Sequence, residues 1–193
     1  MTDKIFQYLA THDNNDGPVM VCDTEVVMNN FRSMQRLLPV CANTIYYAMK
    51  ANPHPEILRK LAAAGSMFDC ASRGEINQLV EATGISYDRI SFGNTIKKER
   101  DIDWSYRKGV RLFAFDSEPE LKKLAQNAPG SQVFCRILSE CAGAEWPLSK
   151  KFGCAPEMAI ELLRKAKAWG LEPYGISFHV GSQQTDVSKS ILI

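Results

Sequence analysis

The chain has 193 residues, of which 45% are apolar and 23% are charged, and its formal net charge is +1. This length suffices for one sizeable core, so we expect one domain, or one domain and part of another. The near-zero charge gives no reason to expect a nucleic acid or an acidic membrane as a partner, and no apolar run is long enough for a transmembrane helix. The polar start of the chain, Met1 to Lys4, lacks the pattern of a signal peptide.

The first 40 residues differ in pattern from the rest, and we expect them to form a leader of one strand and one helix. The apolar segment from Gly17 to Asp23 follows a turn and predicts the strand. The segment from Thr24 to Leu38 carries apolar residues at helical spacing and predicts the helix.

From residue 41 to residue 193, short apolar runs alternate with amphipathic runs, which predicts βα units and a parallel sheet in one domain. The expected strands are 44–49, 67–71, 89–93, 111–115, 132–138 and 174–180. The expected helices are 54–64, 74–83, 97–108, 118–127 and 156–169. A barrel and a doubly wound sheet both fit this alternation. Neither a Gly-x-Gly-x-x-Gly nor a Walker sequence is present, which weakens the case for a Rossmann or P-loop fold.

Two of the expected helices begin with a Ser-x-x-Glu capping box. Ser72 is followed by Glu75, and Ser117 is followed by Glu120. We therefore expect both serines to cap their helices through side-chain hydrogen bonds.

Six cysteines, at positions 22, 41, 70, 135, 141 and 154, form no Cys-x-x-Cys pair and lie far in sequence from the three histidines. A metal site is therefore not expected. Cysteines among apolar neighbours are typical of reduced thiols that pack as small hydrophobic residues. We expect a cytoplasmic protein.

The segment from Thr44 to Pro53 is an apolar strand that ends on one lysine, Lys50, and then turns. Pro53 keeps Asn52 out of the helical region, so the chain breaks just after the lysine. A lysine at the carboxyl end of a buried parallel strand is suited to Schiff-base chemistry, because desolvation lowers the pKa of its amine. The alternative is a strand-end lysine whose ammonium simply reaches water.

Three motifs extend this observation: Tyr-Tyr-Ala-Met-Lys-Ala-Asn-Pro at 46–53, Phe-Asp-Cys-Ala-Ser-Arg-Gly-Glu at 68–75, and Ser-Phe-His-Val-Gly-Ser-Gln at 177–183. Together they resemble the fold-type-III pyridoxal-phosphate decarboxylases of the ornithine/diaminopimelate type, from about Gly17 to Gln184. The resemblance implies an α/β fold, the alanine racemase-like (β/α)8 barrel, of which this chain holds about six βα units without the C-terminal β-domain. In such enzymes a leader belongs partly to a separate β-domain and partly to the flank of the barrel.

The resemblance assigns roles to five residues. Lys50 would bond to pyridoxal 5'-phosphate as a Schiff base, and His179 would stack on the pyridine ring; these two are the expected catalytic residues. Ser182 would donate to the cofactor phosphate. Asp69 and Arg136 would lie beside the cofactor, with the Asp69 carboxylate paired to Lys50 or His179, since buried charges need partners.

Several of these residues also have an ordinary structural reading. His179 could be a strand-end histidine with one satisfied hydrogen bond, and Ser182 a plain loop serine. Glu75 matches an acidic residue near the family's active site, but it is equally well explained as half of a capping box. The segment from Glu140 to Lys151 fits either a closing lid or a solvated connection.

The resemblance implies loss of the α-carboxyl group from a basic amino acid, most closely ornithine or lysine, leaving a diamine for polyamine biosynthesis. A diaminopimelate decarboxylase, a non-catalytic decarboxylase-like regulator and a racemase-like pyridoxal-phosphate-binding regulator are the alternatives. A closed barrel needs two further strands. Segments 44–49 and 174–180 would then be open edges, so we expect a homodimer, or association with the missing half. We expect the 193-residue chain alone to be inactive.

Overall fold

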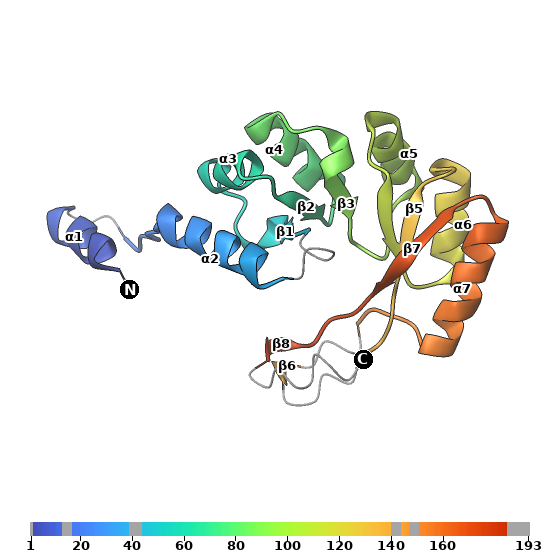
Figure 1. Ribbon diagram of the computed structural model, residues 1–193. Coiled ribbons are helices and arrows are strands. Elements are labelled where there is room, and N and C mark those ends of the chain that lie inside the picture. Colours follow the sequence, from blue (N-terminus) through green and yellow to red (C-terminus); the bar gives the residue numbers. More distant parts are fainter. Residues whose placement is uncertain (1, 13–16, 39–43, 140–143, 147–150, 185–193) are drawn as a thin grey trace.

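The computed structural model describes residues 2–12, 17–38, 44–139, 144–146 and 151–184. Strands and helices alternate along most of this length, as the sequence predicts (Figure 1). The strands of the main sheet are β1 Tyr46–Ala48, β2 Met67–Cys70, β3 Ile90–Phe92, β4 Leu112–Phe115, β5 Gln132–Arg136 and β7 Glu172–Ser177. The helices between them are α3 Pro55–Ala63, α4 Arg73–Thr83, α5 Glu99–Lys108, α6 Glu118–Asn127 and α7 Pro156–Ala168.

The six strands pair in the order β1-β2-β3-β4-β5-β7, and every neighbouring pair is parallel. The order in space therefore follows the order in sequence without reversal. A doubly wound sheet reverses its strand order at a switch point, so this topology is the wall of a barrel. The expected fold class, about six βα units of a (β/α)8 barrel, is confirmed. The two outermost strands, β1 and β7, are the edges that the sequence predicted.

Burial alternates along two strands and shows which face the helices cover. In β2, Phe68 and Cys70 are buried while Asp69 between them is only half-buried. In β5, Cys135 is buried and Arg136 is half-buried. The buried residues pack beneath the helices that lie along the outer side of the sheet in Figure 1. The half-buried residues face the inner side, where this sheet has no second layer.

The N-terminal leader differs from the prediction. It consists of two helices, α1 Asp3–Thr11 and α2 Thr24–Leu37, and the strand expected at 17–23 is absent. Val19 and Met20 are exposed there and have no neighbouring strand to pair with. Instead, Asp23 caps α2, because its carboxylate accepts the N–H of Glu25 at 2.9 Å. The expected helix at 24–38 is confirmed.

One of the two predicted capping boxes forms and the other does not. Ser72 accepts the N–H of Glu75 at 3.2 Å, and the carboxylate of Glu75 accepts the N–H of Ala71 at 2.7 Å. Ser117 occupies the N-cap position of α6 but makes no capping hydrogen bond. The carboxylate of Glu120 instead pairs with two lysines, which removes it from the cap.

Beyond β7, a second sheet joins β6 Ala144–Trp146 to β8 Ser182–Gln184 in antiparallel pairing. The segment 140–151, expected as a lid or a solvated connection, therefore contains a short strand, and its other residues up to 150 lie outside the described part. No helix within the described ranges is long and apolar enough to cross a membrane.

Candidate functional site

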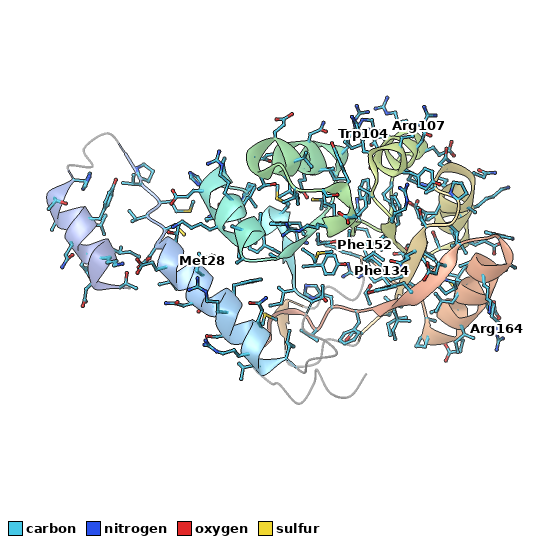
Figure 2. All side chains as sticks on the ribbon, turned by 45° about the horizontal axis from the view of Figure 1, so that its top comes forward. Met28, Trp104, Arg107, Phe134, Phe152 and Arg164 are labelled. Carbon is cyan, nitrogen blue, oxygen red and sulfur yellow. The ribbon has the colours of Figure 1, made fainter. Side chains whose placement is uncertain are left out.

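A cavity of about 510 Å³ lies on the inner side of the sheet, and strands β1 to β5 and β7 all contribute to its walls. Carboxyl ends of parallel strands form the functional face of α/β barrels. The lining residues are Tyr46, Ala48, Asp69, Ser91, Gly93, Leu112, Phe134, Arg136, Tyr174, Gly175, Ile176, Ser177, Phe178 and His179. Figure 2 labels the half-buried Phe134 and Phe152 near the middle of the view, whereas Arg107 and Arg164 project outward from α5 and α7. Three of the predicted site residues, Asp69, Arg136 and His179, thus share one cavity.

Lys50 lies in a 3-10 turn, Met49–Ala51, and not at the end of the strand. Strand β1 ends two residues earlier, at Ala48, and Lys50 is exposed. The exposure of Lys50 fits the alternative expectation, a lysine whose ammonium reaches water. The turn is held on one side by the Tyr47 hydroxyl, which donates to the carbonyl oxygen of Asn52 at 3.1 Å. Lys50 still lies close enough to the cavity for its charge to lower the pKa values of Asp69 and His179.

Asp69 stands on β2, directly beside Ser91 on β3 in the sheet register. The Ser91 hydroxyl donates to one carboxylate oxygen of Asp69 at 2.6 Å. Burial raises the pKa of Asp69 above its ordinary value, while the hydrogen bond from Ser91 and the charges of Lys50 and Arg136 oppose that rise. The cation expected beside Asp69 is thus an electrostatic neighbour, and its hydrogen-bond partner is a serine that the motif search did not single out.

Arg136 ends β5, and its guanidinium lies over the ring of Phe152, 5.6 Å from the ring centroid. The segment that carries Phe152 is fixed to β5, because Cys154 donates its N–H to the carbonyl oxygen of Arg136 at 3.0 Å. Gly153 permits this approach. Its φ is +107°, and a Cβ there would come within 2.8 Å of the backbone of Ile137. Residues 151–153 therefore pass close to the backbone of β5 and place the Phe152 ring against one side of Arg136.

His179 follows β7 and is half-buried. Its Nδ1 accepts the N–H of Gly181 at 2.9 Å, so the neutral ring carries its proton on Nε2. Burial, together with the positive charges of Arg136 and Lys50, lowers the pKa of His179. The ring is thus kept uncharged near neutral pH.

The remaining predicted residues have mixed outcomes. Ser182 lies in β8, where its backbone pairs with Trp146, and its side chain is outside the described part. Its expected contact with phosphate stays a prediction. Glu75 completes the capping arrangement described above, and its charge also raises the pKa of Asp69. Within the described ranges, no group of three or more His, Cys, Asp and Glu side chains is placed to hold a metal ion.

The cavity residues that sequence reasoning missed include Ser91, Gly93, Tyr46 and Tyr174. Tyr46 belongs to the first motif and lies two residues before Ala48. Because side chains two apart in a strand share a face, its position on the inner face could have been found from sequence. Burial raises the pKa of Tyr46, and Tyr174 and Asp69 add to the rise. Ser91 and Gly93 carry no signal in sequence until the register with Asp69 is known.

A family model described as "Pyridoxal-dependent decarboxylase, pyridoxal binding domain" matches residues 24–191, which is most of the chain. The chain belongs to this family. Among curated relatives, the lysine/ornithine decarboxylase of Selenomonas ruminantium is 40% identical over 166 residues, covering 86% of this chain and 42% of the relative. An ornithine decarboxylase from Nicotiana glauca is 46% identical over 142 residues, covering 73% of this chain and 33% of the relative.

Solved structures agree with the family assignment. Lysine decarboxylase from Selenomonas ruminantium superposes with a TM-score of 0.85 at 38% identity, covering 98% of this chain and 48% of that one. Lysine/ornithine decarboxylase from Vibrio vulnificus, complexed with cadaverine, gives a TM-score of 0.83 at 31% identity, covering 99% of this chain and 49% of that one. The chain therefore spans less than half the length of these relatives.

The cofactor of this family is pyridoxal phosphate, and the residues of the cavity fit it. A volume of about 510 Å³ is within the usual range for small-molecule sites. The cations of Lys50 and Arg136 suit an anionic group, the flat neutral ring of His179 suits an aromatic one, and Phe134 supplies an apolar wall. Lys50 is the amine beside the cavity.

Proposed function

We propose that this chain forms the pyridoxal-phosphate-binding part of a decarboxylase that converts ornithine or lysine to a diamine and CO2. The observation that carries the proposal is that Asp69, Arg136 and His179 line one cavity on the inner face of the sheet, with Lys50 close enough for its charge to act on Asp69 and His179. The names of the relatives, which are ornithine and lysine decarboxylases, support the substrate class.

Pyridoxal phosphate supplies an electron sink for the electron pair that is left when a carboxyl group departs. Lys50 is the residue proposed to hold the cofactor covalently through Nζ. Arg136 and the Lys50 side of the cavity attract anionic groups, namely a phosphate or a carboxylate. The carboxylate of Asp69, when ionised, would balance these cations.

His179 presents an uncharged ring at the same cavity, because its lowered pKa keeps it neutral at pH 7. A neutral ring can stack on an aromatic cofactor without adding a further cation to a site that already holds Lys50 and Arg136. The apolar side chains of Phe134, Ile176 and Phe178 also line the cavity and would exclude water when it is filled.

The domain division proposed from sequence has support in burial. Helix α1 contributes no buried residue and α2 contributes only Phe31, which supports our proposal that residues 1–40 are a leader and residues 41–193 the barrel part. A cytoplasmic location remains our proposal. For the working assembly we propose a homodimer or association with the C-terminal half of such an enzyme, because β1 and β7 are edge strands suited to further pairing.

The test of the proposal is to identify the lysine that binds the cofactor. The chain is incubated with pyridoxal phosphate, reduced with borohydride and digested, and the pyridoxyl-labelled peptide is sequenced by mass spectrometry. We expect the label on Lys50 and its loss in Lys50→Arg. A label on another lysine, with Lys50 unmodified, contradicts the assignment. Adding ornithine, lysine or diaminopimelate before reduction tests the substrate class, since the preferred amine protects Lys50 at the lowest concentration.

A further inference from the structure

The carboxyl group of Asp69 occupies the space that a side chain at position 93 would fill. An ideal Cβ on Gly93 would lie 2.0 Å from Oδ1 of Asp69, and 2.6 Å from both Cγ and Oδ2. These distances are far below van der Waals contact, so any side chain at this position forces the carboxyl group to move. The position is set by the sheet: Asp69 pairs with Ser91, and Gly93 donates its N–H to the carbonyl oxygen of Cys70 at 2.9 Å.

Ser91 fixes the same carboxyl group by a hydrogen bond. Its side chain is buried, and its hydroxyl donates to Oδ1 of Asp69 at 2.6 Å, a length typical of a hydroxyl bound to an ionised carboxylate. Ser91 lies on β3 and Gly93 directly follows the strand, two residues on, so both positions face the inner side of the sheet. Both line the cavity together with Asp69.

We propose that Ser91 and Gly93 are positioning residues for Asp69: the serine hydroxyl holds one carboxylate oxygen, and the missing side chain at 93 provides the room for the group. The inference rests on the proposed function only in that the cavity Asp69 serves is taken as the cofactor site. It concerns residues that lie outside the three sequence motifs.

Other charges also act on Asp69. Lys50 from the turn after β1 and Arg136 from β5 favour its ionised form. Glu75 from α4 opposes ionisation, and the Tyr46 hydroxyl on β1 is near enough for Asp69 to act on it. Burial raises the pKa of Asp69, and among the effects that lower it the hydrogen bond from Ser91 is the largest. Removing its hydroxyl should therefore raise that pKa while the four surrounding groups stay in place.

The experiment follows the titration of the Asp69 carboxyl carbon by NMR in the cofactor-free chain. Ser91→Ala is expected to raise the pKa of Asp69, and Ser91→Thr, which keeps a hydroxyl, is expected to restore it. In Gly93→Ala the added methyl group displaces the Asp69 carboxyl group from the Ser91 hydroxyl, so the pKa is expected to rise as well. The matched control is Ser131→Ala, because Ser131 is also buried and its hydroxyl has no hydrogen-bond partner within the described residues.

An unchanged Asp69 titration in Ser91→Ala, or a shift equal to that in Ser131→Ala, overturns the inference. A second arm measures retention of pyridoxal phosphate against pH. If Asp69 is the counter-charge of the cofactor site as proposed, loss of retention at low pH in Ser91→Ala should move to higher pH by the shift seen in the titration. If the titration shifts as expected while no variant, including the unmodified chain, retains the cofactor, the positioning role stands and the proposed function fails.

Discussion

At the scale of single residues, the site works by balancing charges that the fold brings together from distant parts of the sequence. Asp69 accepts a hydrogen bond from Ser91 and is acted on by the cations Lys50 and Arg136 and by the anion Glu75, and His179 is acted on by the same two cations. The same cations have opposite effects on the ionisation of Asp69 and of His179. The cations favour the charged form of Asp69, whereas they disfavour the charged form of His179.

The lowered pKa of His179 makes stability depend on pH on the acid side of neutrality. The unfolded chain, in which histidine has its ordinary pKa of about 6.5, binds the proton more readily than the folded chain does. The free energy of unfolding should therefore fall as the pH drops from about 7 through the lowered pKa of His179. Urea unfolding at steps of pH measures this, and His179→Gln should lose less stability over the same interval than the unmodified chain.

The control for this prediction is His12→Gln. His12 is exposed at the end of α1, away from the cavity, so its replacement should leave the acid-side loss in place. Equal pH slopes for the unmodified chain and for His179→Gln would show that His179 is not held neutral by its surroundings.

At the scale of elements, a buried charge cluster joins the loop after β3 to helix α6. The ammonium of Lys97 lies 3.0 Å from a carboxylate oxygen of Glu120, with their side chains 0% and 3% exposed. Lys97 also donates to the carbonyl oxygens of Asn94 at 2.8 Å and Ala114 at 2.5 Å, and Lys123 pairs with Glu120 from the other side. Burial lowers the pKa of Lys97 to about 8, against the opposing effect of Glu120.

Glu120→Gln should destabilise the chain strongly, because it leaves the buried ammonium of Lys97 without its counter-charge. Breaking a buried pair by removing one partner costs about 3–5 kcal/mol. Glu118→Gln is the matched control on the same helix, since Glu118 pairs with Lys165 at the surface, with side chains 51% and 43% exposed. It should cost no more than about 1 kcal/mol. Equal free energies of unfolding for the two variants, measured in urea, would contradict the prediction.

The elements themselves were largely predictable from sequence, and the exceptions have local physical causes. Alternating apolar and amphipathic runs predicted all six strands of the main sheet to within a few residues. The strand expected before Asp23 failed because an apolar run without a neighbouring strand has nothing to pair with. The capping role expected for Glu120 failed because a distant lysine competes for its carboxylate, and no local pattern reveals that lysine.

The site was predictable where a motif marks it and unpredictable where only the register does. Lys50, Asp69 and His179 stand within motifs, and the structure places all three at or near one cavity. A 3-10 turn follows β1 and exposes Lys50, and no pattern around the lysine marks that turn in advance. Ser91 becomes visible only when β3 is laid beside β2.

At the scale of the whole molecule, the described sheet has two open edges and an uncovered inner face. Parallel sheets are ordinarily covered on both faces, and exposed edges pair readily with other strands. The edge strand β7 and the residues after it carry three large exposed hydrophobic side chains at alternating positions: Tyr174, Ile176 and Phe178. This combination predicts association of the 193-residue chain through the β7 side of its sheet.

Sedimentation velocity over a range of concentrations should show this chain shifting from smaller to larger species as concentration rises. Ile176→Lys places a charge on the edge strand and should move that transition to higher concentration, because a charge on an edge opposes strand pairing. Ile160→Lys is the matched control: Ile160 is 54% exposed and Ile176 is 55% exposed, but Ile160 lies on the outer helix α7. If both variants change the association equally, general surface hydrophobicity drives it. A chain that stays monomeric at every concentration would show that its open edges are blocked, and pairing through β7 would be rejected.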